Sequence, residues 1–254
     1  MNELAKTTLA TALTALALLA LWAFATGPGG VESFVLPPPA AVLGALRQGW
    51  IDGLLLPHIA YTGRAALVGL AIGASLGILV GGVVSMVRPL EYFMVPLVSG
   101  MQSVPKIAVA PLIIAYFGFG IESKVFTVAL LTFFPLFVAT VAGLRAVDAN
   151  IVDMFRAFSA SRLHILIHAR LPAAGNYIFG ALQIAVVLAL IGAVISEFIA
   201  STQGVGFVIK TQAGELDISV MFAAIISLAL LGVAAGALVR FAQRRVLFWI
   251  DPAR

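Results

Sequence analysis

Apolar residues are gathered in six long stretches separated by short polar segments, and this pattern decides the class of protein. A helix needs about 20 mostly apolar residues to cross the hydrocarbon core of a bilayer. The six stretches reach this length and predict an all-α integral membrane protein with six transmembrane helices. They are Thr8–Thr26, Ala65–Met86, Tyr92–Gly118, Ser123–Gly143, Asn176–Ser196 and Ile218–Val239.

The composition supports this class and excludes others. Of the 254 residues, 62% are hydrophobic and 10% are charged, whereas soluble domains are about one quarter charged. The net charge of +4 is spread over short loops, so it does not indicate a nucleic-acid partner. The chain has no cysteine, which excludes disulfides and thiol chemistry. The histidines do not stand at metal-ligand spacing and no GxxxxGK[ST] motif occurs, so we expect no metal and no bound nucleotide in this chain.

Lysine and arginine are distributed unevenly between the two sides that six spans define, which predicts the orientation. With the N-terminus inside, the cytoplasmic side receives Lys6, Arg88, Arg145, Arg156, Arg162, Arg170, Arg240, Arg244, Arg245 and Arg254. The outer side receives Arg47, Arg64, Lys124 and Lys210. We therefore expect both termini in the cytoplasm. The first stretch is interpreted as a retained span, because its apolar run is longer than that of a cleaved signal peptide.

The whole chain, residues 1–254, is predicted to form one transmembrane domain. Residues 1–34 hold the first span and an outer linker, residues 35–64 an outer segment, and residues 65–245 a core of five spans. In the outer segment, a proline triplet ending at Pro39 precedes the run from Ala40 to Trp50. This run is either a short amphipathic helix on the membrane surface or an ordinary connector.

Glycines recur every fourth residue along the second span, at Gly69, Gly73, Gly77 and Gly81. One face of this helix is therefore bare of side chains, so that another helix can approach it closely. The spacing leaves open whether that neighbour belongs to the same subunit or to another.

Two charged residues lie within or next to a span. Lys106 follows Ser103 and Pro105 in the middle of the third stretch, which its prolines predict to be broken. A lysine at this depth opposes insertion by about 2.5–3.5 kcal/mol unless it faces water or a partner. It either lines a pathway or reaches an interface. Glu197 closes the fifth stretch and either caps the span in interfacial water, lines the pathway or pairs with a basic residue.

Residues 148–172, here called the polar segment, are the only long polar interruption in the second half of the chain. Asp148 and Asn150 predict a helix that begins near Ile151, and Ser159 to Ser161 interrupt it. A second helix is expected from Arg162 to Ala169. Pro172 is expected to prevent its direct continuation into the fifth span.

The first of these short helices carries Met154, Phe155 and Phe158, with Asp153 and Arg156 beside them. Such apolar side chains suit the groove of a partner protein better than water. The polar segment is therefore predicted to be a docking site on the cytoplasmic side.

The polar segment also resembles the EAA loop of ABC importer permeases. Asp153 stands where that family has glutamate, Ser159 where it has glycine six positions later, and Leu171 and Pro172 match its Leu-Pro pair. Met154 and Phe155 replace the two alanines of the family motif. Residues 103–148, VLPPPAAVL before the second span, and residues 197–207 are similar to nitrate/sulfonate/taurine-type permeases, and the resemblance extends from about residue 35 to 245.

This resemblance implies a type I ABC importer permease with a cytoplasmic coupling helix, in the bacterial inner membrane. It implies a second permease copy, two ATPase subunits that bind ATP and Mg, and a periplasmic or lipid-anchored substrate-binding protein. The residues expected to couple the permease to the ATPase are Asp153, Met154, Phe155, Arg156, Phe158, Ser159, Arg162, Leu171 and Pro172. Ser103, Pro105, Lys106 and Glu197 are the pathway candidates.

The leading hypothesis is a permease subunit, without enzymatic activity of its own, for a small anion such as a sulfonate, nitrate or related oxoanion. Similar permeases carry riboflavin or pyrimidine precursors, which is the first alternative. A membrane-embedded enzyme is an alternative of another class, although the spans lack a paired acid/base or metal constellation. A stand-alone secondary transporter would show an inverted repeat of two halves, and no such repeat is obvious.

Overall fold

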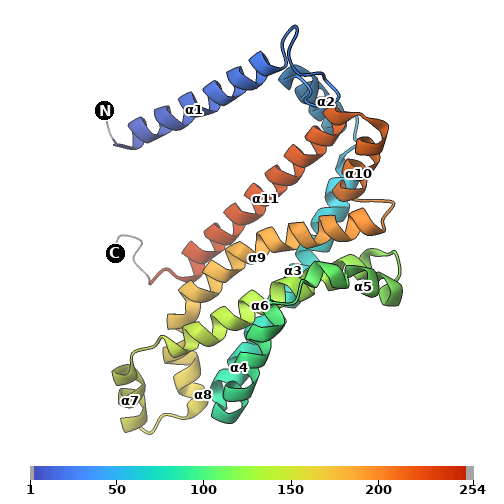
Figure 1. The fold of residues 1–254 in the computed structure, drawn as a ribbon. Coiled ribbons are helices and arrows are strands. Elements are labelled where there is room, and N and C mark those ends of the chain that lie inside the picture. The colour runs from blue at the N-terminus through green and yellow to red at the C-terminus, as the bar shows by residue number, and fades with distance from the viewer. Residues whose placement is uncertain (1–2, 250–254) are drawn as a thin grey trace.

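The structure is a computed structural model that describes residues 3–249, a range that is helical without any β-strand (Figure 1). The α-helices are α1 (Glu3–Ala25), α2 (Pro39–Ile51), α3 (Leu56–Met86), α4 (Arg88–Gln102), α5 (Ala110–Phe117), α6 (Ile121–Arg145), α7 (Ala149–Ala157), α8 (Arg162–Ile165), α9 (Leu171–Ile199), α10 (Val205–Glu215) and α11 (Ile218–Val246). A 3-10 turn, η1 (Lys106–Val109), and a π-helical turn, η2 (Leu166–Arg170), complete the series. Arg254 and the outermost residues of the predicted 1–254 domain lie outside the described range.

Six units of the described chain have the length and apolar character of membrane spans. Five are single helices, and the sixth is the bent pair formed by α4 and η1–α5. These units coincide with the six predicted stretches, so the prediction of an all-helical, six-span fold is confirmed. The boundaries differ in places: α3 begins at Leu56 instead of Ala65, and α11 continues to Val246 instead of Val239.

The two ends of the spans define two sides of the molecule. Figure 1 shows the start of α1, the α7–α8 region and the end of α11 together on one side. Helices α2, α5 and α10 lie at the opposite ends of the spans. The start of α1, the end of α11 and the polar segment thus share a side, as six crossings require.

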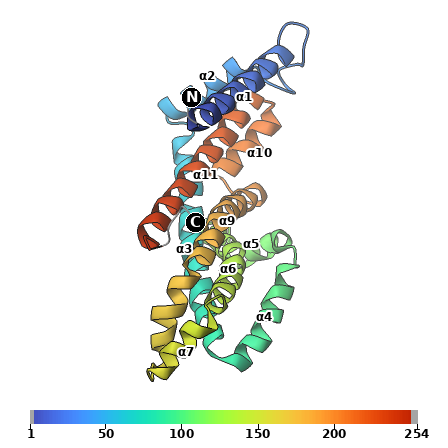
Figure 2. The same ribbon diagram turned by 90° about the vertical axis from the view of Figure 1, so that its left-hand side faces the viewer.

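The third span is broken, as its prolines predict. Its two halves meet at an angle of 83°, and the bend is visible in Figure 2. Pro105 lies in the break with a non-helical ψ of 90°. Proline has no N–H to donate and its ring crowds the preceding turn, so it favours a break of the helix at this point. Pro96, by contrast, lies inside α4 without ending it.

Helix α3 packs most extensively against α6, and the glycine row forms this contact. A Cβ atom added to Gly77 would lie 2.7 Å from the carbonyl oxygen of Phe133, and one added to Gly81 would lie 3.0 Å from that of Phe137. Gly69 and Gly73 likewise face α6 without room for a side chain. The bare helix face is therefore occupied within the same chain.

The fifth span is longer than predicted, because α8, η2 and α9 run as one helical stretch from Arg162 to Ile199. The expectation that Pro172 would prevent this continuation was wrong. Pro172 stands in the first turn of α9, directly after the π-helical turn Leu166–Arg170. A π turn widens the helix by one residue and shifts its hydrogen-bonding register, so the missing N–H and the proline ring are accommodated without a break.

Helix α2 shows that the run from Ala40 to Trp50 in the outer segment is helical. It begins at Pro39, where a missing N–H is tolerated because the first helical N–H groups have no intrahelical acceptor. Trp50 of α2 donates its indole N–H to Ser227 Oγ of α11 at 3.0 Å. The C-terminal end of α1 is attached by Trp22, which donates to the carbonyl of Pro37 at 3.0 Å and whose ring lies tilted beside that of Phe222.

Candidate functional site

Helix α7 in the polar segment begins and ends where local side chains dictate. The Asp148 carboxylate accepts the Asn150 N–H at 2.8 Å and caps the first turn. At the other end Ser159 has φ of 58°, in the left-handed region that favours glycine. Val152 faces inward and packs with Ile165 and Ala169. The α7 helix is thus held on the end of the spans by one buried side and leaves its other side free.

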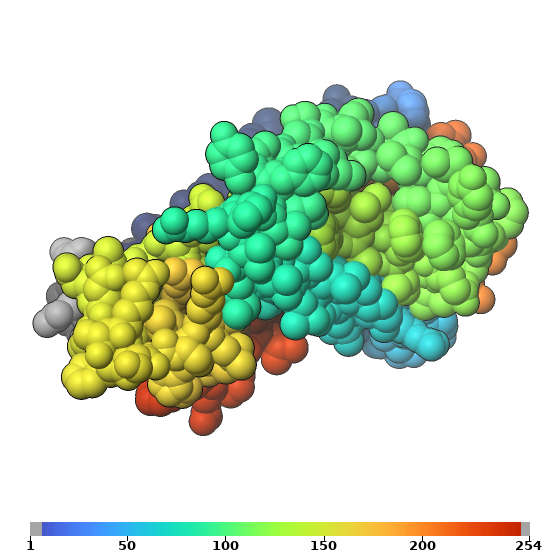
Figure 3. All heavy atoms as spheres, turned by 90° about the horizontal axis from the view of Figure 1, so that it is seen from below, coloured from blue at the N-terminus to red at the C-terminus, as the bar shows by residue number. Residues whose placement is uncertain are grey.

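The free side of α7 is apolar. Phe158 is 82% exposed and Met154 is 51% exposed. With Ser159 and His164 they border a shallow hollow of about 500 Å³. Figure 3 shows the α7–α8 region, in yellow, at the surface of one end of the molecule. Phe155 differs from the other two, because it is half-buried against the Val152 cluster and near the His164 ring.

The remaining predicted residues of the polar segment take separate positions. Asp153 and Arg156 form an exposed ion pair at 2.9 Å, which at the surface adds about 0–1 kcal/mol. Arg162 begins α8 and faces a different, arginine-lined cavity. Leu171 and Pro172 lie in the first turn of α9. The structure therefore groups Met154 and Phe158 on one surface and separates Arg162, Leu171 and Pro172 from it.

Lys106 lies at the break of the third span. Its ammonium group donates to the Gln102 carbonyl at 3.0 Å and lies 4.8 Å from the centre of the Phe134 ring. Ser103 and Pro105 beside it are exposed. The lysine thus binds the last carbonyls of α4, where a helix presents partial negative charge, and shields its charge over an aromatic face.

Glu197 does not cap its span in water, because it is fully buried. Its carboxylate accepts the Thr62 hydroxyl at 2.8 and 3.0 Å and the Gly206 N–H at 2.8 Å. The same Thr62 oxygen accepts the Val205 N–H at 2.8 Å. Gly204, with φ of 103°, passes directly against the carboxylate. This cluster joins α3, α9 and the start of α10.

Lys124 was assigned to the outer side, and its burial was not predicted. It is fully buried in the first turn of α6. Its ammonium group donates to the carbonyls of Ala200 at 2.6 Å and Phe119 at 2.7 Å, and to Ser123 Oγ at 3.4 Å. Three acceptors satisfy the three N–H groups of a lysine. The side chain thereby ties the end of α9 to the turn before α6, a role that no local sequence pattern signals.

Within residues 3–249 no group of three or more histidine, aspartate or glutamate side chains could hold a metal ion. The described residues instead combine six span units, one of them broken, with a short helix that exposes aromatic side chains between two spans. This is the architecture of a multi-pass membrane permease. The sequence matches the family of binding-protein-dependent transport system inner membrane components over residues 73–248. The chain belongs to this family.

Known relatives and a solved structure agree with this assignment. The riboflavin transport system permease protein RibX of Chloroflexus aurantiacus is 33% identical over 93% of this chain and 88% of its own. SsuC of Bacillus subtilis, a permease protein provisionally assigned to aliphatic sulfonates transport, is 30% identical over 91% of this chain and 84% of its own. The fold is similar to a chain of the inward-facing MetNI methionine ABC transporter, with a TM-score of 0.58 and 17% identity over 80% of this chain and 98% of the other.

The chain is therefore a permease subunit of an ABC importer and not itself the catalytic component. It is a multi-pass inner membrane protein. Membership of the family implies an ATPase and a substrate-binding protein as partners. The predicted resemblance to ABC importer permeases is confirmed.

Proposed function

We propose that this chain forms the translocation pathway of an ABC importer for a small anionic solute and that α7 couples it to the ATPase. The observation that carries the coupling proposal is the exposed apolar side of α7, with Phe158 82% and Met154 51% exposed. Exposed aromatic side chains on a short helix are suited to a partner's groove. Buried aromatic anchors supply most of the free energy of such contacts.

Rigid attachment of α7 to the spans supports the same role. ATP-driven closure of the partner can shift the permease only through a contact whose free energy differs between the two states. Val152, Ile165 and Ala169 pack α7 against the helix that continues as α9. A displacement of α7 would therefore be carried into a transmembrane span instead of being lost in a loose loop. ATP and Mg would be bound by the ATPase subunits.

The test of coupling is Phe158→Ala, with Phe248→Ala as the matched control. Phe248 follows α11 on the same side of the molecule and is 81% exposed, nearly the same as Phe158. Removing an anchor should weaken ATPase binding by about 2 kcal/mol, or roughly 30-fold. Binding of the purified ATPase subunit to the nanodisc-embedded permease measures this, and coupled uptake should fall in parallel.

If Phe158→Ala and Phe248→Ala bind the ATPase equally well and transport equally well, α7 is not the coupling element. Phe155→Ala is a poorer test, because Phe155 is half-buried within the chain and its loss would also loosen α7.

The proposed solute is an anion such as a sulfonate or related oxoanion. Support comes from Lys106 at the broken span and from the similarity to the aliphatic sulfonates permease protein. The similarity to RibX supports riboflavin or a pyrimidine precursor as the second candidate. Ligand screening of the cognate binding protein distinguishes them: selective binding of a sulfonate or oxoanion supports the first, and selective binding of an aromatic heterocycle overturns it.

We further propose that the permease is a homodimer that binds two ATPase subunits. The side of the molecule that carries α7 is proposed to face the cytoplasm. A pathway with two opposed walls suits two-fold pairing, the commonest symmetry of oligomers. Native mass spectrometry of the complex should show two copies of this chain, and a single copy beside a different permease would contradict the homodimer.

Because the chain has no cysteine, a Phe248→Cys variant reports which side of the membrane the end of α11 faces. An impermeant maleimide should label it only in inverted vesicles if that side is cytoplasmic, and labelling in right-side-out vesicles would reverse the orientation.

A further inference from the structure

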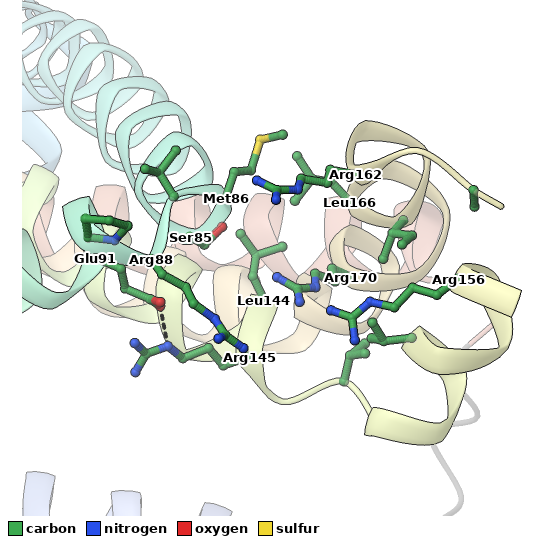
Figure 4. A pocket seen from close by; sticks show the side chains of 16 residues that line it. Ser85, Met86, Arg88, Glu91, Leu144, Arg145, Arg156, Arg162, Leu166 and Arg170 are labelled. Atoms are coloured by element: carbon green, nitrogen blue, oxygen red, sulfur yellow. Dashed lines mark hydrogen bonds and ion pairs between the residues drawn. The ribbon is translucent and has the colours of Figure 1, made fainter.

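A second cavity lies between the polar segment and the turn that joins α3 to α4. Its volume is about 800 Å³. Figure 4 shows Arg88 pointing into it from the α4 side, across from the arginines of the polar segment. Five arginines and one acidic residue contribute to its lining, namely Arg88, Arg145, Arg156, Arg162, Arg170 and Glu91.

The cavity has an excess of positive charge that the carboxylates of residues 3–249 do not neutralise. Glu91 pairs with Arg145, and Asp153 outside the cavity pairs with Arg156. Within residues 3–249 no carboxylate pairs with the other three arginines, Arg88, Arg162 and Arg170. Nε of Arg170 is moreover buried without a hydrogen-bond partner. Like charges in one cavity repel each other, and a buried donor without an acceptor is unfavourable. An anionic ligand in this cavity would therefore be stabilised by both effects.

The position and the other lining residues narrow the anion's chemistry. The cavity is lined by residues at the ends of spans α3 and α6, where long apolar runs give way to charged residues. Between the arginines its wall is apolar, with Leu144, Val152, Ile165 and Leu166. A ligand that carries a phosphate beside an apolar part would satisfy both kinds of wall. Guanidinium groups match phosphate oxygens with paired N–H donors.

We propose that this cavity binds the phosphate of an anionic phospholipid headgroup from the leaflet on the α7 side. Basic pockets between transmembrane helices are a known way of holding such headgroups. One wall belongs to the α3–α4 turn and the other to the α7–α8 region, so a bound phosphate would bridge the spans and the polar segment. The apolar side chains Met154 and Phe158 do not line this cavity. The site therefore adjoins the surface of α7 proposed to meet the ATPase, with Ala160 bordering both hollows, but it does not include the two exposed anchors of that surface.

The experiment compares the full-length chain in nanodiscs of phosphatidylcholine with nanodiscs that also contain phosphatidylglycerol. The double variant Arg162→Gln, Arg170→Gln removes two guanidinium groups from one wall of the cavity. The single variant Arg88→Gln removes the guanidinium group of an exposed arginine from the opposite wall. Arg240→Gln, an exposed arginine of α11 outside the cavity, is the matched control. Native mass spectrometry measures the phosphatidylglycerol that each variant retains, and the thermal unfolding midpoint is measured in the same nanodiscs. In a separate arm, inorganic phosphate is added to phosphatidylcholine nanodiscs.

Phosphatidylglycerol should bind and raise the unfolding midpoint of the wild type. Each lost guanidinium should weaken retention by about tenfold, and Arg240→Gln should change neither measurement. Equal retention by all variants overturns the proposal. Should inorganic phosphate alone reproduce the full stabilisation with the same variant dependence, the anion site stands but its assignment to lipid is wrong. Should the variants retain lipid normally but lose the ATPase, the arginines serve the ATPase contact and the lipid proposal fails.

Discussion

The glycine row on α3 makes a quantitative prediction about the packing of the spans. In Gly77→Ala the new methyl group would lie 2.7 Å from the Phe133 carbonyl oxygen, 2.9 Å from Leu136 Cβ and 3.0 Å from the Phe137 nitrogen. Ordinary contacts begin at 3.4 Å, so the two backbones must separate by 3.4 − 2.7 = 0.7 Å at the closest atom. Two of the three atoms belong to the α6 backbone, which cannot turn aside as a side chain can. Such overpacking destabilises by about 1–3 kcal/mol.

A second glycine of the same helix provides the control for this effect. A Cβ added to Gly82 meets nothing within 4 Å. Both substitutions bring the same gain in helix propensity, about 1 kcal/mol, and this gain cancels when the two variants are compared. Gly77→Ala should therefore be about 1–3 kcal/mol less stable than Gly82→Ala.

Reversible unfolding of the full-length chain in mixed micelles, followed by circular dichroism, measures this difference. A larger side chain should increase this loss of stability, so Gly77→Leu should be less stable than Gly77→Ala. Equal stability of Gly77→Ala and Gly82→Ala would contradict this prediction, because it would mean that α3 and α6 are not in close contact in the folded chain.

Three further predictions concern the buried acid, the loop and the broken span. Thr62→Val should destabilise the chain by about 2 kcal/mol, because the buried Glu197 carboxylate loses a donor, while Thr202→Val at an exposed position should have little effect; equal unfolding midpoints would contradict this. Ser159→Gly should be neutral or stabilising and Ser159→Val destabilising by about 1–2 kcal/mol, since φ is 58°; thermal unfolding checks the order of the variants. Lys106→Ala should lower uptake of an anionic solute and Lys106→Glu should lower it further, with normal assembly, and unchanged uptake by both would exclude a pathway role.

Some features of this protein follow from short stretches of sequence alone. Each span was predictable because about 20 consecutive apolar residues have few alternatives to crossing a bilayer as a helix. The break in the third span followed from Pro105, and the start of α7 from the capping carboxylate of Asp148. In each case the cause lies within one helical turn of its effect, so it is readable from a run of residues.

Other features depended on residues distant in sequence. Lys124 was predicted only to lie on the outer side, and Glu197 to cap its span, line the pathway or pair with a basic residue. Their burial depends on acceptors and donors from other elements, such as Ala200 for the lysine and Thr62 for the acid. Thr62, which donates to Glu197, belongs to the first part of α3. This part of the helix precedes the predicted start at Ala65.

The six spans, the exposed Met154 and Phe158 of the polar segment and the family were predictable from runs of neighbouring residues. That Pro172 lies within a continuous helix, and that Arg88 faces Arg162 and Arg170 across one cavity, became apparent only in the folded chain. The difference comes from the range of the interactions. Transfer of an apolar run into lipid is a sum over neighbouring residues, whereas the environment of a charge is set by whichever groups the folded helices bring beside it.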